Sequence, residues 1–182
     1  MLKDNRGLSL VELLVSLAIF AVLLTTVFGF MVAGSRAYTR ISDRLSLDLE
    51  TELLLNSLCE SLVDCNGTVS FQGRSLYVIN TENGGHTAEV FTFSPGEGRL
   101  LFGSGAAQKE RSEPLLFYTT VTASDLLSAH TTAFDIRPES ADGSRLDSVH
   151  ILIKLEKGAD LYTAERSLAL RNRPALGAVS TG

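Results

Sequence analysis

The chain has 182 residues, of which 45% are hydrophobic, and a formal net charge of −5 at pH 7. This length suits one domain plus an appendage, because single domains commonly have about 100 to 150 residues. The negative charge argues against nucleic acid as a direct bulk ligand, since such binding rests largely on neutralising phosphates.

The first element in chain order is an apolar run at residues 13–34, which contains no charged residue. At about 1.5 Å per residue, a helix over this run covers the roughly 30 Å hydrocarbon core of a bilayer. The run is longer than the apolar stretch of about 7 to 15 residues in a typical secretory signal peptide. No proline separates it from residues 36–62, which are rich in Leu, Arg and Glu. We therefore expect one very long helix whose first part spans a membrane.

A single carboxylate, Glu12, stands at the start of this apolar run. Moving such a charge toward the centre of a bilayer costs a few kcal/mol. A buried carboxylate is tolerated chiefly when it has a partner of opposite charge. The position of Glu12 therefore predicts a pairing partner for it.

The residues Gly7-Leu8-Ser9-Leu10-Val11-Glu12 follow a short basic leader and precede the apolar helix. In this arrangement they resemble the prepilin signature of type IV pilins and pseudopilins. The resemblance implies that a prepilin peptidase cuts after Gly7 and N-methylates the new terminus at Leu8. It also implies that Glu12 faces the terminal amine of a neighbouring subunit, so that cleavage creates its partner. The chain departs from the usual pattern at Leu8, where the family commonly has Phe.

The same resemblance implies a location and a set of partners. We expect a single-pass protein of the inner (cytoplasmic) membrane whose head lies outside the cytoplasm, and which then enters a pilus or pseudopilus. The expected partners are the prepilin peptidase, other pilin or pseudopilin subunits, an inner-membrane assembly platform and membrane lipid. The machine would be a type IV pilus, a type II secretion system or a DNA-uptake (competence) filament. A plain membrane anchor is the alternative interpretation of this segment.

Beyond the membrane run, apolar residues recur in steps of three or four, which predicts an amphipathic continuation of the helix over residues 36–65. They are Tyr38, Ile41, Leu45, Leu49 and Leu53, followed by Leu54, Leu58 and Leu62. The stripe moves around the helix axis between these two groups. We expect the lower group to meet other subunits and the upper group to pack under the head. The alternative is that the whole helix serves only the core of the head.

Cys59 and Cys65 are the only cysteines, and no histidine near them completes a metal site of the usual spacing. Outside the cytoplasm they are a candidate disulfide that would pin the helix end to the following loop. The alternative is a pair of small, buried thiols.

After Gly67 the sequence changes to short β-prone runs separated by turn residues, which predicts a β-rich head over residues 66–173. The runs are 68–71, 75–80, 89–94, 99–102, 115–121, 133–137, 148–155 and 164–170. Short connections between them favour antiparallel pairing. The alternating residues Val149, Ile151, Ile153 and Leu155 are expected to lie against the long helix. The fold class is therefore α+β: a long transmembrane and amphipathic helix packed on a C-terminal antiparallel sheet.

Residues 161–172 resemble the last strand of minor pilins and pseudopilins of the W and J types, through their hydrophobic pattern and a terminal Arg-Asn. The remaining residues, 174–182, are expected to form a flexible tail. The expected layout is a leader at 1–7, a transmembrane and polymerisation helix at 8–35, its amphipathic continuation at 36–65, the head at 66–173 and the tail.

No residue pattern predicts an enzyme, a cofactor or a metal site. His86, His130 and His150 are far apart, and no nucleophile motif is present. The Gly-rich segments at 95–98 and 103–105 lack the residues of a phosphate-binding loop and are expected to be turns. Asp125, Asp135, Asp142 and Asp147 lack calcium-site spacing and are expected to be solvated. The alternative functions are a membrane-anchored β-domain that binds a partner without polymerising, and an anchored enzyme with a polar pocket in its head.

Overall fold

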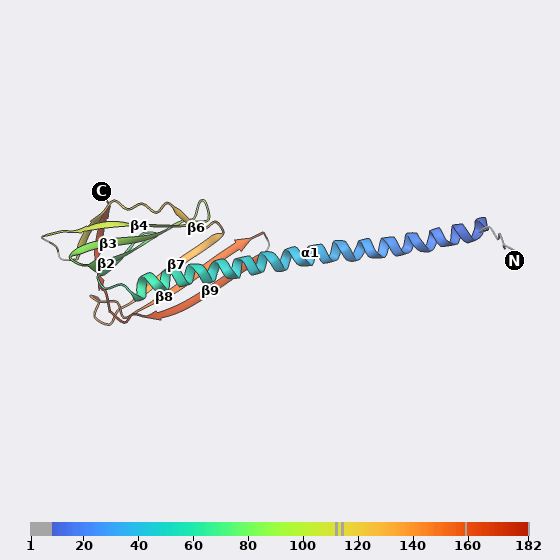
Figure 1. The fold of residues 1–182 in the computed structure, drawn as a ribbon. Helices are drawn as coiled ribbons and strands as arrows, with labels where there is room; N and C mark the ends of the chain where they lie inside the picture. The colour runs from blue at the N-terminus through green and yellow to red at the C-terminus, as the bar shows by residue number, and fades with distance from the viewer. Residues whose placement is uncertain (1–8, 112, 114, 159, 182) are drawn as a thin grey trace. The chain divides into compact units, whose positions relative to one another are not determined.

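The computed structural model describes residues 9–111, 113, 115–158 and 160–181, and the chain divides into two units, Met1–Asp43 and Arg44–Gly182. One helix, α1 (Leu10–Val63), contributes to both units. All strands of the described residues lie in the second unit, which we call the head unit (Figure 1). The protein is thus α+β, with a long N-terminal helix followed by a β-rich head, which confirms the predicted fold class.

In the first unit, α1 presents its apolar side chains outward. Every residue from Ser9 to Ser42 is exposed, and the most apolar 18-residue window has a mean hydropathy of 2.5. A helix that is hydrophobic all round is stable only where something apolar surrounds it, such as a bilayer or other helices. By length and composition this helix can cross a membrane.

In the head unit, α1 becomes one-sided and buries Leu54, Leu58 and Leu62. The helix ends at Val63, two residues before the predicted limit at 65, and Gly67 follows in a place where a Cβ would meet the carbonyl oxygen of Ile79. The chain therefore turns directly from the helix into the sheet at a position that only glycine fits.

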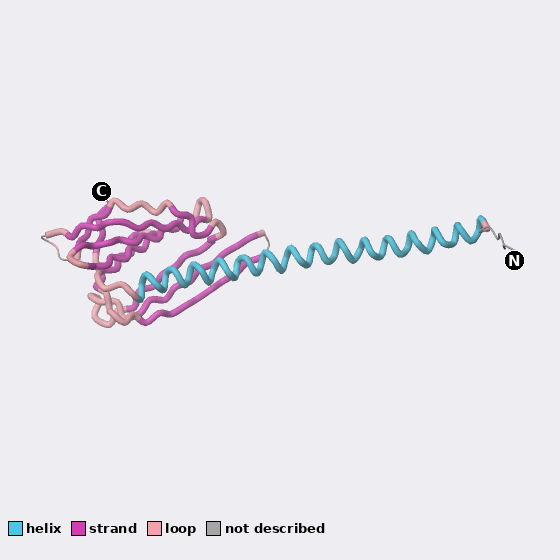
Figure 2. The backbone as a smooth tube through the Cα atoms, viewed as in Figure 1, coloured by secondary structure: helices cyan, strands magenta, loops and turns pink. Residues whose placement is uncertain are grey.

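A three-stranded antiparallel sheet packs on this part of α1. Its strands, in spatial order, are β7 (Thr131–Glu139), β8 (Ser148–Lys157) and β9 (Asp160–Ala169). Figure 2 shows these strands running alongside the last turns of the helix. Val149, Ile151, Ile153 and Leu155 of the central strand are fully buried in one cluster with the helix leucines, which confirms the predicted packing of that face.

The second sheet has eight strands. They are β1 (Thr68–Gln72), β2 (Ser75–Glu82), β3 (Gly85–Ser94), β4 (Arg99–Lys109), β5 (Leu116–Thr119), β6 (Asp125–Ser128), β10 (Ala175–Leu176) and β11 (Ala178–Thr181). The path runs β10-β1-β2-β3-β4-β5-β11, and β6 pairs with β4. One face contributes Phe91 and Phe93 to the cluster with α1, while the other face holds a second core around Tyr77, Val90 and Phe117.

The Gly103-Ser104-Gly105 segment was expected to be a turn, and this prediction is wrong, because these residues lie inside β4. A Cβ on Gly103 would come within 2.5 Å of the Thr122 carbonyl oxygen, and one on Gly105 within 2.7 Å of Val121 Cγ2. The two glycines therefore let residues 121–123 cross directly over the strand. The expected turn at 95–98 is present, with Gly98 at φ 64°.

A flexible tail was expected at 174–182. This prediction is wrong for residues 175–181, which contain two strands of the large sheet. β10 pairs in parallel with β1, and β11 pairs in parallel with β5, at opposite ends of the strand order. Gly177 lies between them and donates its N–H to the Val69 carbonyl oxygen, at 3.1 Å. The segment contains little but small residues, so its pattern did not predict that it joins two edges of one sheet.

Candidate functional site

The first described residues form a capped helix start. Ser9 precedes the first turn of α1, and its Oγ accepts a hydrogen bond from the backbone N–H of Glu12 at 3.2 Å. A Ser followed three residues later by Glu is the pattern of a capping box, which satisfies the free N–H groups of a helix start. Sequence reasoning treated Glu12 as a charge needing a partner and missed the capping role of Ser9. Gly7 and Leu8, the predicted cleavage and methylation positions, lie outside the described residues.

The lower part of α1 offers a continuous apolar surface and little polar chemistry. Its hydroxyl groups bond within the helix: Ser16 Oγ donates to the Glu12 carbonyl oxygen at 2.7 Å, and Thr26 Oγ1 to the Val22 carbonyl oxygen at 2.9 Å. Such internal bonds let hydroxyl side chains enter an apolar environment without losing a hydrogen bond. This surface can therefore be covered by lipid or by other apolar helices.

In the head unit, two rows of leucines separate as the shift of the stripe predicts. Leu45, Leu49 and Leu53 remain 56%, 58% and 70% exposed. Leu54 and Leu58 are at most 2% exposed and belong to the core of the head. The upper group thus packs under the head, as predicted. The three leucines of the lower group, here called the leucine row (Leu45, Leu49 and Leu53), face away from that core, and what covers them remains a prediction.

Polar contacts join α1 to the three-stranded sheet next to the leucine row. Arg166 of β9 donates to Asn56 Oδ1 at 3.0 Å and to Glu52 Oε2 at 3.3 Å. Tyr162 of the same strand hydrogen-bonds Asp48, and this bond raises the pKa of the Tyr162 hydroxyl. The strand is therefore fastened along one side of the helix.

The two cysteines are free thiols in the structure, so the candidate disulfide is not formed. Cys65 is buried, its thiol donates to the Ile79 carbonyl oxygen at 3.5 Å, and burial raises its pKa to about 11. Cys59 lies on the last turns of α1, where the Arg166 guanidinium is 3.9 Å from its sulfur. The two thiols thus have different surroundings, which the sequence spacing did not reveal.

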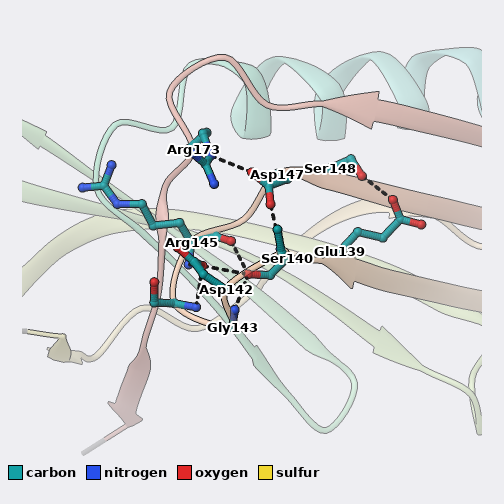
Figure 3. A network of polar contacts seen from close by, with 10 residues as sticks. Glu139, Ser140, Asp142, Gly143, Arg145, Asp147, Ser148 and Arg173 are labelled. Atoms are coloured by element: carbon teal, nitrogen blue, oxygen red, sulfur yellow. Dashed lines mark hydrogen bonds and ion pairs between the residues drawn. The ribbon is translucent and has the colours of Figure 1, made fainter.

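The loop between β7 and β8 holds a polar network that the sequence did not predict (Figure 3). The Asp142 carboxylate accepts the backbone N–H groups of Ser144 and Arg145, both at 3.0 Å, and these bonds hold its pKa well below the usual range. Asp147 accepts the Ala141 N–H at 2.8 Å and pairs with Arg173 at 2.6 Å. These carboxylates organise a loop and fasten it to the C-terminal segment.

The histidines serve similar local roles. His130 Nδ1 lies 3.1 Å from Glu50 Oε2, His150 Nε2 lies 2.7 Å from Glu165 Oε1, and His86 packs edge-on against Phe117. Within the described residues, no three His, Cys, Asp or Glu side chains gather as a group that could hold a metal ion.

A model of the prokaryotic N-terminal methylation motif matches residues 2–28. The chain therefore carries a prepilin signature of the type IV pilin and pseudopilin type, and this class is structural rather than enzymatic. The motif and the apolar helix together indicate that the chain is anchored in a membrane. No curated protein and no solved structure matched the chain.

Proposed function

We propose that this chain is a minor pilin or pseudopilin: a structural subunit that is cut after Gly7, methylated at Leu8 and built into a filament through its N-terminal helix. The observation that carries the proposal is the position of the methylation motif, at residues 2–28, on a helix whose residues from Ser9 to Ser42 are all exposed. A helix with so much apolar surface needs lipid before assembly and neighbouring helices after it.

In this proposal Glu12 pairs with the methylated amine of Leu8 on an adjacent subunit. The pair would set the register between successive subunits, because an unpaired carboxylate within an apolar bundle costs several kcal/mol. Ser9 caps the helix beside it, so the first turn is ordered before any partner arrives. The chain would wait in the inner membrane with its head outside the cytoplasm, and the assembly platform would draw it into the filament.

Minor status and a W- or J-type role rest on two observations. The head unit runs from Arg44 to Gly182 and contains two sheets, a large structure for one subunit to add to a filament. Residues 161–172 also resemble the last strand of those subunit types. The proposed systems are a type IV pilus, a type II secretion pseudopilus or a DNA-uptake filament, with other pilins as neighbours.

The test is mass analysis of the N-terminus of the protein purified from cells that contain an active prepilin peptidase. We expect a chain that begins at N-methylated Leu8, and a full-length precursor when Gly7 is replaced by a bulky residue. A native protein that begins at Met1 in such cells would overturn the proposal. It would favour instead a membrane-anchored β-domain that binds a partner without polymerising.

A further inference from the structure

The two edges of the three-stranded sheet differ in how they are protected. On one edge, β7 carries a register shift between Thr131 and Ala133, contains Pro138 and contacts β4 of the other sheet. Bulges, prolines and covering elements are the usual devices that stop an edge strand from pairing with another chain.

The other edge has no bulge, proline or covering strand; of the usual devices it has only charged side chains, among them Glu165 and Arg166. β9 pairs with β8 from Asp160 to Ala169 without a register shift, and its sequence contains no proline or glycine. Within the described residues, no strand pairs with its outer side. β9 is therefore a long, regular edge that is open to an added strand.

The register shows which backbone groups face this open edge. The Leu170 N–H donates to the Asp147 carbonyl oxygen at 2.9 Å, and this pair continues the register of Leu168 with Val149. Because bonded pairs alternate along an antiparallel ladder, the even-numbered residues of β9 bond to β8. The N–H and C=O groups of Thr163, Glu165 and Ser167 consequently point toward the open edge.

The leucine row of α1 lies next to the helix row that contacts β9. Successive residues of a helix are about 100° apart, so neighbouring positions define neighbouring rows. Thr51 is buried in the head, Glu52 contacts Arg166 of β9, and Leu53 is exposed. The same order holds one turn earlier, where Leu47 is buried, Asp48 contacts Tyr162 and Leu49 is exposed. Around the axis of α1, the buried row is thus followed by the row that contacts β9 and then by the leucine row.

Strand and helix also run in the same direction with matching spacing. From Tyr162 to Arg166 a strand rises about 13 Å, and from Asp48 to Asn56, the helix residues that they contact, α1 rises about 12 Å. Leucines four residues apart on the helix are about 6 Å apart along its axis. Alternate residues of a strand are about 7 Å apart. The inward side chains of a strand added to β9 would therefore have a spacing close to that of the leucines.

We propose that the open edge of β9 and the leucine row form one docking site for an extended segment of another protein that carries apolar side chains at alternate positions. The backbone of that segment would bond to the free N–H and C=O groups of β9, which only an extended chain can match. Its inward side chains would cover Leu45, Leu49 and Leu53. This site does not depend on processing at Gly7.

A second copy of this chain fits the site less well. Antiparallel pairing of two β9 strands would point their α1 helices in opposite directions, because each helix runs with its own β9. Chains anchored in one membrane by the same helix point in one direction. Thr163, Glu165 and Ser167 are polar residues on the outer face of β9. Parallel pairing about a twofold axis would place these residues of the second copy over the leucines of the first.

The test measures binding of a fluorescent synthetic peptide, in which leucine alternates with threonine, to the full chain in lipid nanodiscs. A peptide of the same composition with its leucines grouped together is the control, and empty nanodiscs give the background. We expect saturable binding of the alternating peptide only, and slower amide exchange in β9 when it is bound. No saturable binding, or equal binding of both peptides, would overturn the proposal.

Two variants locate the bound peptide. Thr163→Pro removes an N–H that faces the open edge and leaves the bonds to β8 in place, whereas the matched control Thr163→Val keeps that N–H. We expect the proline to weaken binding about tenfold or more and the valine to leave it unchanged. Leu49→Ser should also weaken binding, while all three variants keep the thermal midpoint of the wild type.

Equal binding to wild type, Thr163→Pro and Leu49→Ser would refute the site, even if the peptide binds elsewhere. A dimer of the chain joined through β9, detected by crosslinking across the strand in nanodiscs, would refute the assignment of the partner. Neither result would alter the N-terminal mass that tests the proposed function, so the two proposals fail separately.

Discussion

The Oγ of Ser9 and the backbone N–H of Glu12 are hydrogen-bonded at 3.2 Å, which places Glu12 at the third position of a capped helix. A glutamate there suits the positive end of the helix even without a neighbouring subunit. Glu12 therefore occupies a favourable position at the helix start and has a proposed intermolecular role, and substitution can separate the two.

Glu12→Gln and Glu12→Ala form the pair that separates these roles. Glutamine can still occupy a capping box but carries no charge. If Glu12 pairs with a neighbouring terminal amine, both variants should be processed normally and both should enter filaments poorly, by about tenfold or more. Quantitative immunoblotting of sheared filaments measures this. Wild-type incorporation of the glutamine variant would show that capping, not charge, is what assembly requires.

The two leucine groups of α1 predict very different costs in stability. Leu58→Ala removes a fully buried side chain from the core between helix and sheet and should cost about 2 to 5 kcal/mol. Leu53→Ala, at a position that is 70% exposed, should change the free energy of unfolding by less than about 0.5 kcal/mol. Chemical denaturation of the full chain in detergent micelles measures both values, and similar costs would contradict the assignment of the core.

Gly103 tests the crossing of residues 121–123 over β4. In Gly103→Ala the new Cβ would meet the Thr122 carbonyl oxygen at 2.5 Å, and the required shift should cost about 1 to 3 kcal/mol. Gly96→Ala is the matched control, because a Cβ there would meet nothing within 4 Å. Thermal unfolding of the two variants compares them. A neutral Gly103→Ala would mean that the segment does not cross there.

Asp142 gives the head a pH dependence of known sign. Its pKa is lowered in the folded protein by the N–H groups of Ser144 and Arg145, so the carboxylate contributes stability above its unfolded pKa of about 3.9. That contribution is lost as the pH falls below about 4 toward the lowered pKa. Asp142→Asn should therefore unfold at a lower temperature than the wild type at pH 7, and the difference should shrink at pH 3. A constant difference across this range would contradict the linkage.

The thiols should react in a fixed order. The Cys65 side chain is buried and its pKa is raised to about 11, so little of the reactive thiolate forms near neutral pH. Cys59 is only partly buried. Mass spectrometry after brief treatment with iodoacetamide should find Cys59 modified first, and both residues modified in denaturant. Equal rates in the native protein would show that the helix end opens freely.

Sequence patterns predicted the features whose cause is local. The apolar run, the continuation of the helix beyond it and the alternation of Val149 to Leu155 follow from residue spacing alone, and the structure contains all three. The two leucine groups of α1 could be distinguished in the sequence because a helix has a fixed number of residues per turn. In each case neighbouring residues decide the outcome.

Features that depend on distant residues were missed. Gly103 and Gly105 have the composition of a turn, and only the segment at 121–123 explains why they lie in a strand. The terminal residues are too small to show a strand pattern, and their partners in β1 and β5 are far away in the sequence. The Ser-x-x-Glu spacing of Ser9 and Glu12 predicts a capping role for Ser9. The sequence interpretation considered only the charge of Glu12.

The pairing of β10 with β1 and of β11 with β5 constrains the order of events during biosynthesis. The earliest strand of the head cannot gain its outer neighbour until the last stretch of the same sheet has left the ribosome. Folding of this sheet is therefore completed only after residues 175–181 have been synthesised. A chain arrested before Ala175 would expose two unsatisfied sheet edges to quality-control proteases, so only copies that contain both strands should accumulate.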